Sequence, residues 1–118
     1  MKNQFFETTY DASNEVMTAK FLSTCQKIDA KNFEEIQKKA TELLNGDECV
    51  DIADFVFDLD NVIYVSSAGL RMFSSINKVA QDLNVNYKLI NLRRDILKMF
   101  QLTGYASIFE IEEKVEFK

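Results

Sequence analysis

The feature that most constrains this fold is the alternation of segments with extended and helical periodicity. Aromatic and β-branched residues over 5–10 and apolar residues over 16–23 predict two strands, joined as a hairpin by turn residues 11–14. Further along the chain, apolar residues recur at helical spacing over 29–46, 67–84 and 93–104. These segments alternate with strand-like apolar segments over 51–60, 85–92 and 107–111. The order ββαβαβαβ requires crossover helices between parallel strands. It therefore predicts a small α/β sandwich with helices packed on a mixed, mostly parallel sheet.

Local signals define the ends of these elements. Asp29 is expected to cap the first helix, with Glu34 and Glu35 near the positive end of its dipole. Gly46 follows as a stop signal. The dense apolar run over 55–59 is typical of a strand covered on both faces. The last residues, 112–118, are expected to continue the final strand, form one turn or fray.

Length and charge narrow the functional class. At 118 residues one domain, 1–118, is expected. A net charge of −5, from 14 basic and 19 acidic side chains, gives no electrostatic footprint for nucleic acid or an anionic membrane. The sequence has no run approaching 18 apolar residues, so the cytoplasm is the expected compartment.

Residues that carry catalytic or metal chemistry are sparse. There is no histidine to act as a base, no G-x-S-x-G elbow and no glycine-rich phosphate loop, so no cofactor is expected. Cys25 and Cys49 lack metal-ligand spacing and are interpreted as buried or half-buried free thiols. Asp58 and Asp60, with Asp54 nearby, fit either a strand-end turn or, less simply, a metal site.

The segment "YVSSAGLR" (64–71) places two hydroxyls where a strand gives way to a helix. One serine is explained as a helix cap, which stabilises a helix by about 1 kcal/mol. The second serine and Gly69 are not explained in this way, and a glycine in a first helical turn often marks a close approach of another backbone or a ligand. A phosphate here would lie among free N–H groups, with Arg71 within one turn.

Three segments give this serine pair a context. "FVFDLDNVIYVSSAGLRMFSSI" (55–76), "LTGYASIFEI" (102–111) and "QKIDAKNFEEI" (26–36) resemble, in that order, elements of the STAS family of sulfate-transporter and anti-sigma-factor-antagonist domains. The resemblance extends from about residue 5 to residue 111 and reproduces the element order inferred above.

The resemblance implies a binding protein and not an enzyme. Antagonists of this family bind a serine kinase that is also an anti-sigma factor; phosphorylation of one serine releases the kinase, and a phosphatase resets the switch. Matching Gly69–Leu70 to the family's Gly-Leu step places the phosphoacceptor on Ser67, at the helix cap. The implied partner-binding residues are the neighbours of this serine and one acidic residue: Asp29, Ser66, Ala68, Gly69, Leu70 and Arg71.

The sequence departs from the family pattern at two positions beside the acceptor. Ser66 stands where the family often has Asp, and Ala68 where it often has Ser or Thr. The first departure keeps an alternative open: a constitutive STAS subunit of a transporter or signalling complex, without a phosphorylation switch. Other residues have simpler interpretations. Arg93 and Arg94 fit solvated side chains beside Asp95, and Tyr64 fits core or edge packing.

Overall fold

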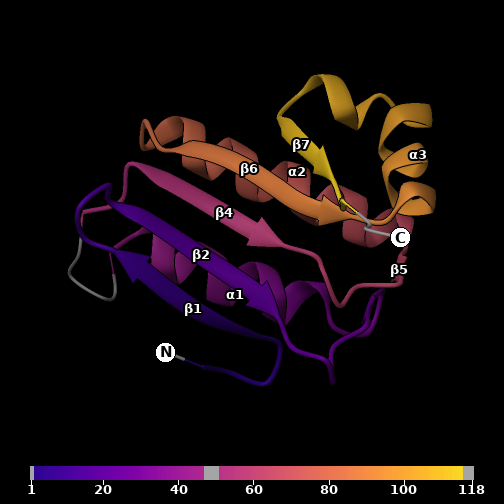
Figure 1. Cartoon of the computed structure of the whole chain (residues 1–118), viewed down its shortest axis with the longest axis horizontal. Helices are drawn as coiled ribbons and strands as arrows, with labels where there is room; N and C mark the ends of the chain where they lie inside the picture. Colours follow the sequence, from indigo (N-terminus) through magenta and orange to yellow (C-terminus); the bar gives the residue numbers. More distant parts are fainter. Residues whose placement is uncertain (1, 47–50, 116–118) are drawn as a thin grey trace.

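A five-stranded sheet in the order β1-β2-β4-β6-β7 forms the centre of the fold (Figure 1). The structure is a computed structural model that describes residues 2–46 and 51–115. Its strands are β1 (Phe6–Asp11), β2 (Val16–Phe21), β4 (Asp54–Asp58), β6 (Asn86–Leu92) and β7 (Glu110–Glu113). β1 and β2 pair antiparallel and all other neighbours pair parallel, which confirms the predicted hairpin on a mostly parallel sheet.

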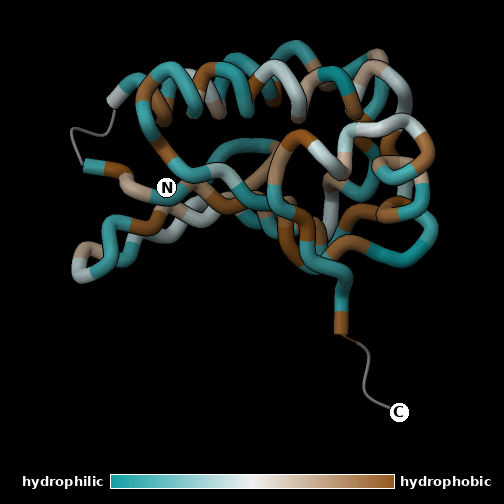
Figure 2. The backbone as a smooth tube through the Cα atoms, turned by 90° about the horizontal axis from the view of Figure 1, so that it is seen from above, coloured by the Kyte–Doolittle hydropathy of each residue, from teal (hydrophilic) through white to brown (hydrophobic). Residues whose placement is uncertain are grey.

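Three α-helices follow the three predicted stripes. They are α1 (Phe33–Leu44), α2 (Ser67–Asp82) and α3 (Arg94–Leu102). α1 and α2 lie along the same side of the sheet (Figure 2). Strand β4 is therefore covered on one face, and the expectation of cover on both faces was wrong. Phe55 and Phe57 are buried under the helices, whereas Val56 points to the opposite face and is half-buried beside an open hollow of about 460 Å³.

Two short strands were not predicted. β3 (Lys27–Ile28) and β5 (Tyr64–Val65) pair in parallel as a separate two-stranded sheet. The N–H of Ile63 donates to the carbonyl of Gln26, and the N–H of Ser66 donates to that of Ile28, which extends the contact at both ends. Strand β5 runs directly into α2, so this small sheet fixes where that helix begins.

The last strand begins later than the sequence indicated. Gly104 adopts a positive φ of 82° at the end of α3, and a 3₁₀ turn, η1 (Tyr105–Ser107), follows it. The Ser107 N–H donates to the Gly104 carbonyl, so this residue is part of the turn and not of the strand. At its other end, β7 extends beyond residue 111 to Glu113. Continuation of the final strand was one of the three alternatives expected for the segment that starts at residue 112.

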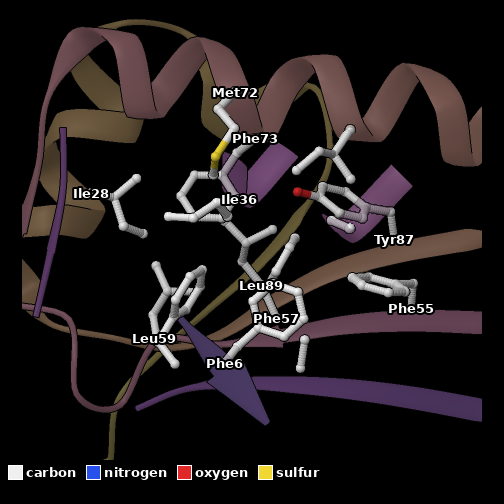
Figure 3. Packing of buried hydrophobic residues seen from close by; sticks show 14 of the residues in the cluster. Phe6, Ile28, Ile36, Phe55, Phe57, Leu59, Met72, Phe73, Tyr87 and Leu89 are labelled. Atoms are coloured by element: carbon white, nitrogen blue, oxygen red, sulfur yellow. The ribbon is translucent and has the colours of Figure 1, made fainter. Parts of the chain in front are cut away.

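An aromatic cluster fills the space between the sheet and the helices (Figure 3). Phe57 lies at its centre on β4, fully buried. Its ring centroid is 5.1–6.1 Å from those of five other rings, in mostly edge-to-face arrangements that favour aromatic pairs. These rings belong to Phe6, Phe21, Phe55, Phe73 and Tyr87. Because Phe73 is on α2, the cluster ties that helix directly to the sheet.

The loop from β4 to β5 is fixed by polar contacts at the carboxyl ends of the strands. Asn61 donates through Nδ2 to the carbonyl of Phe21 at 2.9 Å. The Asp60 carboxylate lies 2.9 Å from Lys114 Nζ and 3.9 Å from Lys20 Nζ. These contacts join β2, the loop and the segment after β7 at the edge of the sheet where α2 starts, and they hold the path of the chain into the serine pair.

Candidate functional site

Ser66 caps helix α2. Its backbone is extended (φ −79°, ψ 173°), and its Oγ accepts the N–H of Gly69 at 3.2 Å. Its carbonyl accepts the N–H of Leu70 at 2.9 Å as the first helical bond. The expectation that Ser67 is the cap was therefore wrong by one residue, because the preceding serine has the extended backbone that a cap requires.

Ser67 is the first helical residue, and its side chain is exposed. In the part of the chain that the structure describes, its hydroxyl has no hydrogen-bond partner. The first turn of α2 contains no acidic side chain, so the positive end of the helix dipole is not offset by a neighbouring carboxylate. The site thus combines an accessible hydroxyl, N–H groups without helical acceptors and a favourable field for negative charge.

Gly69 lies against the two-stranded sheet. A Cβ at this position would be 2.8 Å from Val65 Cγ1 and 3.0 Å from both the Cγ2 and the carbonyl oxygen of Ile28. The glycine thus permits a close approach of the helix to the β3 backbone, as the sequence indicated. Ala68 and Leu70 are buried beside it. Three of the expected partner-binding residues, 68–70, therefore lie beneath the site, and the residues on either side of them, Ser67 and Arg71, are exposed.

Exposed side chains flank Ser67 on both sides along the chain. Arg71 is exposed one turn later and forms no ion pair with any residue of the described ranges. Ile63 and Tyr64 are 41% and 47% exposed just before the cap. Sequence reasoning assigned Tyr64 to packing. The exposure of Tyr64 follows from strand alternation, which sequence reasoning missed. Val65, the next residue, is fully buried, so the side chain of Tyr64 points to the opposite face.

Asp29 lies near this edge but does not cap α1. The cap residue is Asn32, so the expectation that Asp29 caps α1 was wrong. Its Oδ1 accepts the N–H of Lys31 at 2.9 Å, and its carbonyl accepts the N–H of Phe33 at 3.1 Å. These two hydrogen bonds close a turn that begins at Asp29, three residues before the cap. Asp29 follows directly on β3, which pairs with β5, and this places it on the same side of the molecule as the serine pair.

The aspartates of the β4 end serve as turn and ion-pair residues. Asp58 Oδ1 accepts the N–H of Asp60 and the Nδ2 of Asn91, both at 3.0 Å. A hydrogen bond from Lys114 lowers the pKa of Asp60. No group of three or more His, Cys, Asp or Glu residues within 2–46 and 51–115 is arranged to hold a metal ion.

The cysteines and the paired arginines have local roles. Cys25 is buried, as expected, and burial raises the pKa of its thiol. Cys49 lies outside the described residues. Arg93 lies 3.8 Å from Asp95, as expected, while Arg94 pairs with Glu113 at 3.2 Å. None of the helices in the described ranges is long and apolar enough to cross a bilayer.

Comparisons with known proteins bear on this site. A sequence model of the STAS domain matches residues 14–117. A candidate anti-sigma factor antagonist, BtrV of Bordetella bronchiseptica, is 27% identical over 90 residues, which are 75% of this chain and 73% of BtrV.

Solved structures share the fold at low sequence identity. An anti-sigma-factor antagonist (STAS) domain protein from Planctomyces limnophilus has a TM-score of 0.77 at 14% identity, over 93% of this chain and 91% of that one. Unphosphorylated SpoIIAA, an anti-sigma factor antagonist, has a TM-score of 0.65 at 12% identity, over 94% and 89% of the two chains. Phosphorylated SpoIIAA of Bacillus has 0.62 at 15%, over 90% and 89%. The solved structures that share this fold also include the anion transporter SLC26A9, with TM-scores of 0.65 and 0.68 at 12% identity over 86% of this chain and 17–18% of that one, so the fold is common to antagonists and transporter domains. The chain belongs to the STAS domain family.

Proposed function

We propose that this chain is a cytoplasmic partner-switching protein whose binding to an anti-sigma factor is controlled by phosphorylation of Ser67. The partner is an anti-sigma factor that is itself a serine kinase, and a phosphatase restores the free hydroxyl. The observation that carries the proposal is the exposed Ser67 hydroxyl at the first position of α2. In this proposal the chain acts by binding and catalyses no reaction.

The named relatives support this assignment. BtrV is named as a candidate anti-sigma factor antagonist, and SpoIIAA has been solved in both unphosphorylated and phosphorylated forms. A protein of the same fold therefore accepts phosphate. We assign the corresponding phosphate of this chain to Ser67 because Gly69–Leu70 resembles the family's Gly-Leu step and because the Ser67 side chain is exposed.

Phosphorylation converts a neutral hydroxyl into a strong charge. Ser67 Oγ forms a bond to the γ-phosphorus of ATP, the bond to ADP breaks, and the hydroxyl proton passes to a base of the kinase. The product carries about −1.5 to −2 charges at pH 7. The free N–H groups of the first turn favour such an anion, so the folded chain accommodates the product without rearrangement. A partner that packs against the uncharged Ser67 would have to bury the new phosphate charge in the interface, which is unfavourable.

The exposed side chains around Ser67 define the docking surface, which consists of Ile63, Tyr64, Ser67 and Arg71. It offers two apolar side chains, one of them aromatic, beside one cation. Tyrosine and arginine are enriched among the residues that dominate protein interfaces. The backbone of Tyr64 is paired with β3, and that of Ser67 and Arg71 is helical, so the backbone of this surface is ordered before the partner binds, which lowers the entropic cost of binding.

Incubation with the cognate kinase and ATP, followed by peptide mapping in a mass spectrometer, tests the acceptor. We expect one phosphate, on Ser67, and none on the Ser67→Ala variant. Ser66→Ala is the matched control because it removes the adjacent hydroxyl and costs only about 1 kcal/mol of cap stability. Phosphate on Ser66, or on neither serine with a kinase that phosphorylates another substrate, contradicts the proposal.

Binding variants separate the switch from the constitutive alternative. Ser67→Asp is expected to weaken binding of the kinase, and Ser67→Ala is expected to keep it. Ser66 in place of the family's Asp favours the alternative, a STAS subunit without a switch. Equal binding by both variants, with no phosphate on Ser67, would exclude the switch and leave the alternative without one.

A further inference from the structure

We propose that Arg71 captures the phosphate on Ser67 within the same helix, so that phosphorylation also removes Arg71 from the docking surface. This inference rests on the proposed function only for its biological use. The pairing itself follows from two positions on α2, the first helical residue and the residue four places later.

Helix geometry brings the two side chains together. Residues at i and i+4 lie on the same face, with Cβ atoms about 5–6 Å apart. Helical side chains also incline toward the N-terminus, so the Arg71 side chain covers the turn that begins at Ser67. Both residues are exposed, and Arg71 forms no ion pair within the described ranges that a phosphate would have to displace. The guanidinium can donate two parallel hydrogen bonds to phosphate oxygens.

The cap residue strengthens this pairing. Because Ser66 caps the helix with a hydroxyl, no carboxylate of the first turn of α2 repels the phosphate or competes for Arg71. Other charged side chains lie on the elements packed near this end of α2. They are Lys27 on β3, Asp29 after it, and Glu34 and Glu35 in the first turn of α1. Their fields act equally on wild type and on Arg71 variants, so the difference between these proteins isolates the arginine.

The consequence is a switch with two coupled parts. In the unmodified chain, Arg71 is available to an acidic group of the partner. In the phosphorylated chain, it pairs with the phosphate of its own helix and offsets one of the phosphate's negative charges. The partner then meets a phosphate and also loses a cation, and both changes act in the direction of release.

The test uses phosphoserine inserted at position 67 during translation, so that it needs no kinase. The phosphate pKa is measured by phosphorus NMR in the folded protein and in 8 M urea. A free phosphoserine has a second pKa of about 6. We expect a lower pKa in the folded state, and we expect Arg71→Gln to raise it by about 0.2–0.4, as pairs of this spacing predict.

Three comparisons decide the outcome. Arg71→Lys should keep most of the effect, whereas Lys78→Gln, at an exposed position further along α2, should leave the phosphate pKa unchanged. The Arg71 side-chain NMR signals should shift when position 67 is phosphorylated. An identical phosphate pKa in wild type and Arg71→Gln, with unmoved arginine signals, overturns the pairing. If the pairing holds but the cognate kinase does not modify Ser67, only the proposed function fails.

Discussion

Replacing Gly69 with alanine tests whether the contact between α2 and β3 fixes the position of the site. An alanine Cβ would lie 2.8 Å from Val65 Cγ1 and 3.0 Å from the carbonyl oxygen of Ile28. The first contact can relax by a side-chain shift, but the second involves the backbone of a paired strand. Overpacking of this kind costs about 1–3 kcal/mol. Alanine also gains up to about 1 kcal/mol of helix propensity over glycine.

The net expectation is a destabilisation of up to about 2 kcal/mol, measured by urea unfolding with circular dichroism. The propensity contribution is measured separately from Ser75→Ala and Ser75→Gly, since Ser75 is exposed in the interior of the same helix. Their difference should be about 1 kcal/mol in favour of alanine. The reasoning is refuted if Gly69→Ala stabilises the protein by an amount similar to that difference, because the helix would then have room to accept a side chain.

Three further perturbations test other parts of the structure. The hydroxyl of Tyr87 is buried without a hydrogen-bond partner in the described part of the chain, so Tyr87→Phe should stabilise the fold by about 1 kcal/mol in urea unfolding; a loss of stability would reveal a missed partner. The hydrogen bond from Lys114 lowers the pKa of Asp60, so the ionised Asp60 stabilises the fold at pH values above its unfolded-state pKa of about 4. This stabilisation is lost as the pH falls through the lower pKa of the folded state. Asp60→Asn should flatten the acid limb of the stability–pH curve, and an unchanged limb would exclude this pair as its cause. If Tyr64 is an interface anchor, Tyr64→Ala should weaken partner binding by about 30-fold in calorimetry. Leu102→Ala, at the exposed end of α3, should leave the affinity unchanged. Equal effects of the two substitutions would show that the docking surface does not contain Tyr64.

The main elements of the fold could be predicted because their periodicity is local. The stripe of Ile36, Ala40 and Leu43 defines α1 without any knowledge of its neighbours, and all three are buried. The two-residue strands β3 and β5 could not be found in this way, because two residues show no alternation. The uncovered face of β4 could not be predicted either, because Val56 is apolar although it lies on the face of β4 opposite α1 and α2.

The cap of α2 was predicted to within one residue. Ser66 and Ser67 have the same side chain, so the sequence cannot distinguish the cap from the first helical residue; the backbone dihedrals decide it. The cap of α1 shifted from Asp29 to Asn32 for a related reason, because both are good cap residues and the turn between them settles the choice. The exposure of Tyr64 depends on the pairing of β5 with β3, which is a contact between distant segments.

The most direct test of this account compares partner binding by the same chain with and without phosphate. Calorimetric titration of the cognate anti-sigma factor would use unmodified protein and protein carrying phosphoserine at position 67. Arg71 offsets only part of the phosphate charge, and burial of the uncompensated remainder in an interface costs about 3–5 kcal/mol, so we expect the affinity to fall at least 100-fold. Equal affinity of the two forms would contradict the claim that the hydroxyl at the start of α2 controls the partner.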